Sequence, residues 1–210
     1  MKSEKKEQLR EEILDAVIKC KRENGGGFIK LTQVAALVGI SDRTLNRYFP
    51  DKEELIYEAA GKSLRNRGRA LIEKYNAQNK NGLNGRERFL LLVKTEVDRM
   101  REDPNYALMF VSAYTTCLYT SVCKKIQNFS FDEEVRQVVT VTVEEGIKDG
   151  SIRNDVTPLD TYLLTSSNFN GLAQRLIYLY SVDQPKTEQR EEILHVFDHY
   201  ITMMDEYLKP

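Results

Sequence analysis

The sequence predicts an all-α protein of about nine helices, with a three-helix N-terminal domain at residues 1–50 and a larger helical domain at residues 51–210. Three observations support this fold class. Residues 32–52 fit two short helices around a tight turn, apolar residues recur at helical spacing through most of the remaining chain, and no segment makes a convincing strand. One strand-like alternation, Val138 to Val143, is framed by charged residues and has no strand partner, so we interpret it as helix.

The motif at the centre of this prediction is TQVAALVGISDRTLNRYFPDK, residues 32–52. Its first short helix carries an apolar stripe made of Val34, Ala35 and Val38. Gly39 follows, where a residue in the left-handed conformation can end a helix without a Cβ clash. Ser41 is a strong N-cap for the second helix, which ends before Pro50. The inward face of that helix is expected to contain Leu45, Tyr48 and Phe49. Because two such short helices cannot cover each other's apolar faces, they need a third helix, which residues 5–23 supply.

Local start and stop signals place the remaining helices in order. Asp51 is a natural N-cap, and Glu54 three residues later completes a capping-box pattern for a helix from Lys52 to about residue 76. After a polar, glycine-bearing loop at 78–85, further helices are predicted at 86–101, 131–148, 158–179 and 187–208. Pro104 is placed for the first turn of another helix, and we interpret 115–130 as a continuing or broken helix.

Composition describes an ordinary cytoplasmic protein. The chain has 210 residues, 41% hydrophobic and 30% charged, and it contains neither an apolar run long enough to span a membrane nor a signal-peptide pattern. Residues 1–75 contain 16 Lys and Arg and 12 Asp and Glu, whereas residues 76–210 contain 15 Lys and Arg and 20 Asp and Glu. A basic N-terminal part therefore precedes an acidic remainder. Cys20, Cys117 and Cys123 are an odd number without metal-ligand spacing, which favours free thiols. Redox sensing by the last two is an alternative.

The segments ILDAVIKCKRENG and LTQVAALVGISDRTLNRYFPDKEEL together resemble the N-terminal domain of TetR-family transcriptional regulators. The positions in register are Val34-Ala35, Gly39-Ile40-Ser41, Thr44-Leu45, Tyr48-Phe49 and Lys52-Glu53-Glu54-Leu55, with Gly25 at the usual distance after Ile13-Leu14. The match covers roughly the first quarter of the chain. The sequence departs from the family pattern at three positions. Asn46 stands where the family usually has an aromatic residue, and Lys21 replaces a usual core aromatic residue. Lys30 stands where a capping Thr is common, which leaves Thr32 as the nearest hydroxyl for the helix start.

This resemblance implies a ligand-responsive transcriptional regulator, most often a repressor released by a small-molecule effector, acting as a homodimer on a palindromic double-stranded DNA operator. Effector binding would change the conformation of the larger helical domain, so that the two N-terminal domains of a dimer no longer match the spacing of the operator half-sites. The helix from Lys52 would transmit that change. The expected DNA-binding residues are Thr32, Ser41, Arg43, Thr44, Asn46, Arg47, Tyr48 and Lys52. Arg43 suits a bidentate contact to guanine and Asn46 one to adenine, whereas hydroxyl groups and Lys52 suit phosphates. The alternative is that Arg43 and Arg47 are ordinary solvated charges.

Two surfaces are predicted in the larger domain. A mainly apolar effector cavity is expected between the helices that begin at residues 52, 86 and 158. Its candidate lining is aromatic, aliphatic or amide in character: Tyr75, Phe89, Val93, Phe110, Tyr114, Tyr119, Asn168 and Phe169. The many tyrosines hint at a roomy cavity, because a buried tyrosine needs a partner for its hydroxyl. The last two long helices are apolar over much of their circumference, which predicts a dimer contact through Phe169, Leu172, Leu176, Phe197, Tyr200 and Ile201.

Other classes of function have less support. His195 and His199 could ligate zinc as an i, i+4 pair, which would make a metal-dependent hydrolase the third hypothesis. The segment HVFDH lacks the glutamate that metalloprotease chemistry uses, and a surface or interface pair is favoured. No Gly-rich phosphate loop or GxSxG elbow occurs, so we predict no enzyme activity and no cofactor. A helical ligand-binding or protein-interaction module without DNA binding is the second hypothesis.

Overall fold

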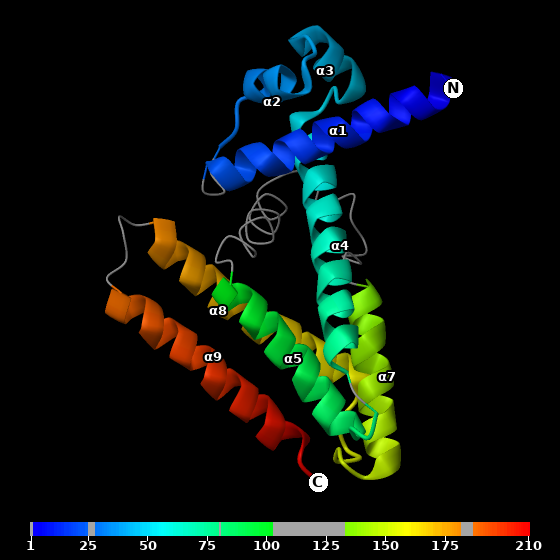
Figure 1. Cartoon of the computed structure of the whole chain (residues 1–210), viewed down its shortest axis with the longest axis vertical. Coiled ribbons are helices and arrows are strands. Elements are labelled where there is room, and N and C mark those ends of the chain that lie inside the picture. Colours follow the sequence, from blue (N-terminus) through cyan, green and yellow to red (C-terminus); the bar gives the residue numbers. More distant parts are fainter. Residues whose placement is uncertain (1, 25–27, 80, 103–132, 182–186) are drawn as a thin grey trace. The chain divides into compact units, whose positions relative to one another are not determined.

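The computed structural model describes residues 2–24, 28–79, 81–102, 133–181 and 187–210. These residues form eight helices and no strand, which confirms the all-α prediction (Figure 1). The helices are α1 (Lys2–Glu23), α2 (Leu31–Val38), α3 (Asp42–Tyr48), α4 (Lys52–Gln78), α5 (Gly85–Glu102), α7 (Glu133–Asp149), α8 (Pro158–Ser181) and α9 (Thr187–Leu208). The helix predicted at Pro104 and the segment 115–130 lie outside the described residues.

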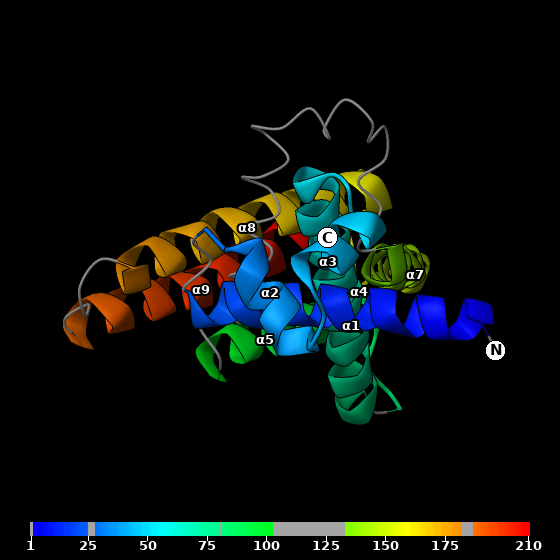
Figure 2. The same ribbon diagram turned by 90° about the horizontal axis from the view of Figure 1, so that it is seen from above.

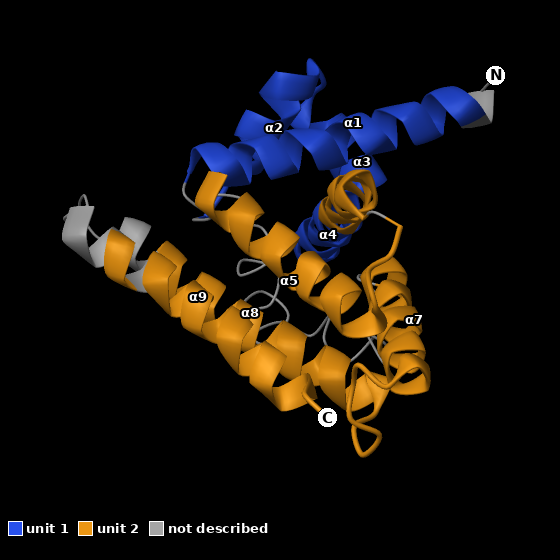
Figure 3. Cartoon of the chain, turned by 60° about the horizontal axis from the view of Figure 1, so that its bottom comes forward, with its two compact units in different colours: residues 1–66, 108–131 blue, residues 67–107, 132–210 orange. Residues whose placement is uncertain are grey.

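The chain divides into two compact units, and the division falls inside α4, between Asn66 and Arg67 (Figure 3). The sequence places a domain boundary earlier, after residue 50. Of the described residues, 2–24 and 28–66 belong to the first unit, and 67–79, 81–102, 133–181 and 187–210 belong to the second. A single helix, α4, therefore contributes residues to both units.

In the first unit, α2 packs against both α1 and α3. The turn between α2 and α3 has the predicted chemistry: Gly39 has a φ of 73°, and the Ser41 hydroxyl accepts a hydrogen bond from the Thr44 N–H at 3.2 Å. The start of α4 follows the same logic, because Asp51 Oδ1 accepts from the Glu53 N–H at 2.8 Å. The shared core of this unit contains Ile13, Leu14, Val17, Val34, Ala35, Leu45, Phe49, Leu55 and Ala59.

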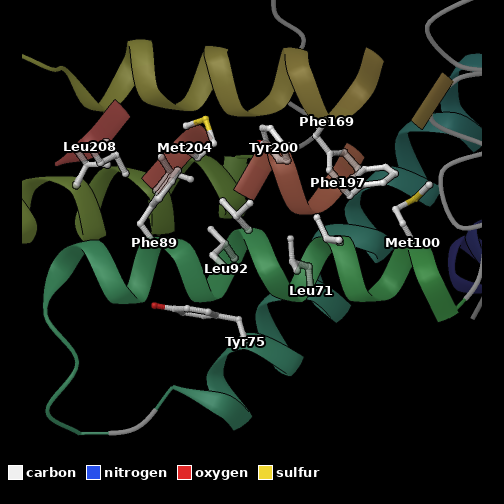
Figure 4. Close-up of a cluster of buried hydrophobic side chains, with 14 of the residues drawn as sticks. Leu71, Tyr75, Phe89, Leu92, Met100, Phe169, Phe197, Tyr200, Met204 and Leu208 are labelled. Carbon is white, nitrogen blue, oxygen red and sulfur yellow. The ribbon is translucent and has the colours of Figure 1, made fainter. Parts of the chain in front are cut away.

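In the second unit, α5 packs against α7, α7 against α8, and α8 against α9. Helix α5 also packs against α9, so the four helices surround one core. Helices α8 and α9 run side by side in both Figure 1 and Figure 2. Side chains from α4, α5, α8 and α9 converge in this core (Figure 4). The labelled members are Leu71, Tyr75, Phe89, Leu92, Met100, Phe169, Phe197, Tyr200, Met204 and Leu208.

The strand-like VVTVTV segment lies within α7, as predicted. Its two threonines return their hydroxyl groups to the helix backbone: Thr140 donates to the Arg136 carbonyl and Thr142 to the Val138 carbonyl, both at 2.9 Å. Val139 and Val143, four residues apart, are both buried on one face. Helical spacing of the buried valines therefore prevails over the β propensity of the individual residues.

The first turn of α5 is capped by a segment that lies far away in the sequence. The Gly85 N–H donates to Asp149 Oδ2 at 2.8 Å, and the Arg86 N–H donates to the Ser151 hydroxyl at 3.1 Å. Hydrogen bonds from Ser151, and then from Gly85, hold the pKa of Asp149 below its usual value. Because the folded pKa is lowered, this carboxylate stabilises the fold at neutral pH, and its contribution is lost as acid protonates it.

Candidate functional site

Helix α3 has one anchored face and one free face. Leu45 is fully buried and Phe49, at the helix C-cap, is 3% exposed, so the helix is fixed to the core of the first unit. Arg43, Asn46 and Arg47 are exposed, and their spacing of three and four residues places them on one side of the helix. Two guanidinium groups and one amide are thus presented to solvent by a rigidly held helix.

An arginine of α1 supports this arrangement from within the unit. The Arg10 guanidinium of α1 lies 4.3 Å from the centre of the Phe49 ring and forms an ion pair with Glu58 of α4. Burial, the largest influence, raises the pKa of the Glu58 carboxyl, although the charge of Arg10 acts in the opposite direction. On the same two helices, Lys62 bridges Glu11 and Asp15 at 2.6 and 2.7 Å. These charges connect α1 to α4 and position the end of α3.

The remaining residues predicted to contact DNA have mixed environments. Thr44 and Tyr48 are half-buried, whereas Ser41 is exposed and serves as the cap of α3. Lys52 is exposed, but its Nζ also donates to the Ile29 carbonyl at 3.3 Å. Thr32 is exposed inside α2, whose cap position is occupied by Lys30; there the Lys30 N–H donates to Gln33 Oε1 at 3.4 Å. Thr32 is therefore free to face a ligand but does not cap its helix.

Lys21, which stands where an aromatic residue is expected by resemblance, is nearly covered, with 6% of its surface exposed. Burial, followed by repulsion from Lys52, lowers the pKa of its ammonium group. Its aliphatic chain is therefore buried at the position where the resemblance leads us to expect an aromatic ring.

The second unit contains a cavity of about 60 Å³ among its described residues. Helices α4, α5, α7, α8 and α9 all contribute to the wall. The lining is Arg67, Gly68, Leu71, Leu92, Val93, Glu96, Val135, Val139, Tyr162, Thr165, Ser166, Phe169, Asn170 and Tyr200. The prediction of a space between α4, α5 and α8 thus corresponds to this position, but the space is small rather than roomy compared with typical ligand pockets.

Only some of the predicted lining residues reach this cavity. Val93 and Phe169 do, whereas Tyr75 and Phe89 are buried elsewhere in the core. Asn168 is exposed and donates its amide to the Leu164 carbonyl at 2.8 Å, so Asn170 is the amide at the wall. Phe110, Tyr114 and Tyr119 lie outside the described residues, as do Cys117 and Cys123.

A buried ion pair forms part of the cavity wall and was not predicted from the sequence. Arg67 of α4 binds Glu96 of α5 through both Nε, at 3.0 Å, and a terminal nitrogen. The two side chains are 11% and 10% exposed, and the Arg67 guanidinium also lies 5.3 Å from the centre of the Phe169 ring. The signal in the sequence was Glu96 itself, a carboxylate at helical spacing within the apolar stripe of α5.

Most of the predicted dimer residues are already covered by their own chain. Phe169, Leu176, Phe197 and Tyr200 are at most 4% exposed, and the rings of Phe169 and Phe197 lie 5.8 Å apart within the core (Figure 4). The Tyr200 hydroxyl donates to the Thr165 carbonyl at 2.9 Å, and burial raises the pKa of Tyr200 well above its usual value. Leu172 and Ile201 are half-buried. These four buried side chains cannot meet a partner unless the bundle opens.

Where the structure describes burial along α8 and α9, the large apolar side chains that they expose are different ones. They are Leu159, Leu163, Leu164, Val196 and Met203. Periodicity indicated that both helices are apolar on more than one side, but it did not indicate which of their faces the rest of the chain covers.

Comparison with solved structures shows which known fold this arrangement matches. A TetR transcription regulator from Haloarcula marismortui is 16% identical, with 97% of this chain and 100% of that chain covered at a TM-score of 0.70. The chain has the fold of the TetR family. The transcriptional regulator FadR from Bacillus subtilis, in complex with stearoyl-CoA, is 14% identical at a TM-score of 0.66, with 94% and 98% covered. The fatty acid degradation regulator FadR from Bacillus halodurans is 13% identical, with 93% of each chain covered at a TM-score of 0.65.

The likeness to the TetR fold therefore extends from the N-terminal motif to nearly the whole chain. No protein-family model matches the sequence, and no curated protein does. Among the described residues, none of the helices combines the length and the apolar character that a bilayer span requires.

Proposed function

We propose that the protein is a DNA-binding transcriptional regulator whose second unit responds to a small, mainly apolar effector. The observation that carries this proposal is the exposed Arg43, Asn46 and Arg47 face of α3, fixed by buried Leu45 in a helix-turn-helix of a TetR-type fold. A recognition helix presents its N-terminal residues to base edges in the major groove, and Arg43 is in the first turn of α3. Release of a repressor from its operator is the form of regulation that we propose.

Arg43→Ala and Lys52→Ala are expected to weaken DNA binding in different ways. Loss of Arg43 should cost about 1–3 kcal/mol on the cognate site and relax discrimination at one position per half-site, because a guanidinium reads guanine through two hydrogen bonds. Loss of Lys52 should weaken binding to all sequences alike and reduce the salt slope by about one unit per contact. An operator selected from random DNA, and titrations on cognate and scrambled duplexes at several salt concentrations, provide the measurement.

The matched control is Lys94→Ala, which removes an exposed cation from α5 and should leave discrimination unchanged. Thermal melts accompany the Lys52 variant, because its Nζ also donates to the Ile29 carbonyl. Equal losses on both duplexes for Arg43→Ala would show that this arginine only positions the protein. Unchanged binding for both variants would contradict the DNA-binding proposal.

The effector proposal rests on the cavity of the second unit. Its wall is mainly apolar. The polar groups are the Arg67–Glu96 pair, the Asn170 amide and the hydroxyl groups of Tyr162, Thr165, Ser166 and Tyr200. The charges of that ion pair cancel, so an uncharged ligand with an apolar body avoids burying an unpaired charge. Helix α4 begins at Lys52 and contributes Arg67, Gly68 and Leu71 to the cavity wall. We therefore propose that α4 carries the effector signal to the DNA-binding unit.

Val139→Phe is expected to abolish the effector response while operator binding persists. Val139 lines the cavity from α7 and is 2% exposed, so a larger ring must occupy the space that a ligand needs, at a cost in stability of about 1–3 kcal/mol. Val141→Phe, on the same helix but 41% exposed, is the control and should respond as the original protein does. A library of uncharged apolar compounds, tested for release of the operator duplex, supplies the measurement. A full response in Val139→Phe would remove this cavity as the effector site.

We also propose that the protein acts as a homodimer on a palindromic operator. The surface that we now assign to the contact consists of the exposed apolar residues of α8 and α9: Leu159, Leu163, Leu164, Val196 and Met203. A twofold axis would bring two copies of this surface together. Light scattering tests the proposal, and a monomeric mass at micromolar concentration would contradict it.

A further inference from the structure

Helix α9 carries the only two histidines of the chain, His195 and His199. They are four residues apart, so they lie one above the other on one face of the helix. Both are exposed, and their ring centres are 4.4 Å apart with the ring planes inclined at 58°. The rings are thus close neighbours without being stacked in parallel.

This spacing fits two nitrogen ligands on a single metal ion. With metal–nitrogen bonds of about 2.1 Å, two imidazole rings that bind one ion at about 90° to each other have centres roughly 4.6 Å apart. The observed separation of 4.4 Å is close to that value. Because both side chains extend from one helix, the backbone of α9 fixes the relative positions of their Cβ atoms, which lowers the entropy cost of binding.

The neighbouring charged groups leave the pair accessible. Asp198, which lies between the histidines in sequence, is engaged by Arg101 at 2.5 Å. Within the described residues, no group of three or more His, Cys, Asp or Glu side chains is placed to hold a metal. The protein would therefore supply two nitrogen ligands, and water would fill the other coordination positions.

We propose that His195 and His199 form an exposed two-histidine chelating site for a first-row divalent transition-metal ion. Imidazole ligands suit copper, nickel and zinc, and the general order of stability places Cu²⁺ above Ni²⁺ and Zn²⁺. Mg²⁺ prefers oxygen ligands and should not bind here. An ion that joins two turns of α9 binds the folded helix more tightly than the unfolded chain, so it raises the melting temperature.

Calorimetric titration of tag-free protein with CuCl2, NiCl2, ZnCl2 and MgCl2 tests this site. We expect about one ion per chain for Cu²⁺, weaker binding of Ni²⁺ and Zn²⁺, and none of Mg²⁺. His195→Ala and His199→Ala should each weaken Cu²⁺ binding at least tenfold, because each leaves a single imidazole.

A rescue variant separates the histidine pair from metal binding elsewhere, including at cysteines. Glu191 is exposed, lies outside the proposed dimer contact and precedes His195 by four residues, so His199→Ala combined with Glu191→His rebuilds the same spacing one turn earlier along α9. That double variant should recover most of the affinity that His199→Ala loses. If either single variant binds Cu²⁺ as tightly as the original protein, or if the double variant recovers nothing, the proposal is overturned.

Discussion

Replacing Gly85 with alanine is expected to destabilise the second unit by more than about 3 kcal/mol, beyond the usual range for an overpacked site. A Cβ at Gly85 would overlap the backbone nitrogen of Gly146 and lie 2.6 Å from the Thr142 carbonyl oxygen. Because these are backbone atoms of α7, relief requires α5 and α7 to move apart. That movement would also break the cap that Asp149 provides to Gly85. Urea unfolding followed by circular dichroism measures the loss.

Two other glycines provide graded controls for this prediction. A Cβ at Gly146 would meet the Ile152 side chain at 2.5 Å, and a side chain can shift more easily than a backbone, so Gly146→Ala should cost less. A Cβ at Gly171 meets nothing within 4 Å, so Gly171→Ala should stabilise α8 by about 0.5–1 kcal/mol. If Gly85→Ala were as stable as Gly171→Ala, the close approach of α5 and α7 would be contradicted.

Arg67→Met is expected to cost about 3–5 kcal/mol, because it leaves the Glu96 carboxylate without its guanidinium partner in a largely buried position. The double variant Arg67→Met/Glu96→Leu should recover most of this loss, since a buried ion pair can often be replaced by apolar side chains of similar volume. Urea unfolding at neutral pH compares the three proteins. Because both residues line the cavity, the double variant also tests whether the effector needs their polar groups.

Another ion pair between the same two helices serves as the control. Lys74 of α4 binds Glu102 of α5 at 2.6 Å, but the two side chains are 31% and 65% exposed. Lys74→Met should therefore change stability by less than about 1 kcal/mol. A similar cost for Lys74→Met and Arg67→Met would indicate that burial of the Arg67–Glu96 pair has no energetic consequence.

The sequence by itself determined the elements whose signals are local. The left-handed conformation of Gly39 and the Ser41 cap are set by a few neighbouring residues, so the helix-turn-helix could be predicted closely. The same reasoning placed the beginnings of α4, α8 and α9 at their observed residues. Among the candidate DNA contacts, Arg43, Asn46 and Arg47 could be assigned to the exposed side of α3, because Leu45 and Phe49 define its buried side.

Only the tertiary structure decided which apolar faces are covered and which residues meet across the chain. Periodicity reports that α8 and α9 are apolar on more than one side, but not that Leu176 and Phe197 face inward while Leu163 and Met203 face outward. The Arg67–Glu96 pair and the cap that Asp149 gives to Gly85 join residues 29 and 64 positions apart, and the cavity wall combines residues of five helices. Such contacts depend on how whole helices are rotated and docked. Helix rotation is set by the summed packing of all elements, which no short stretch of sequence encodes.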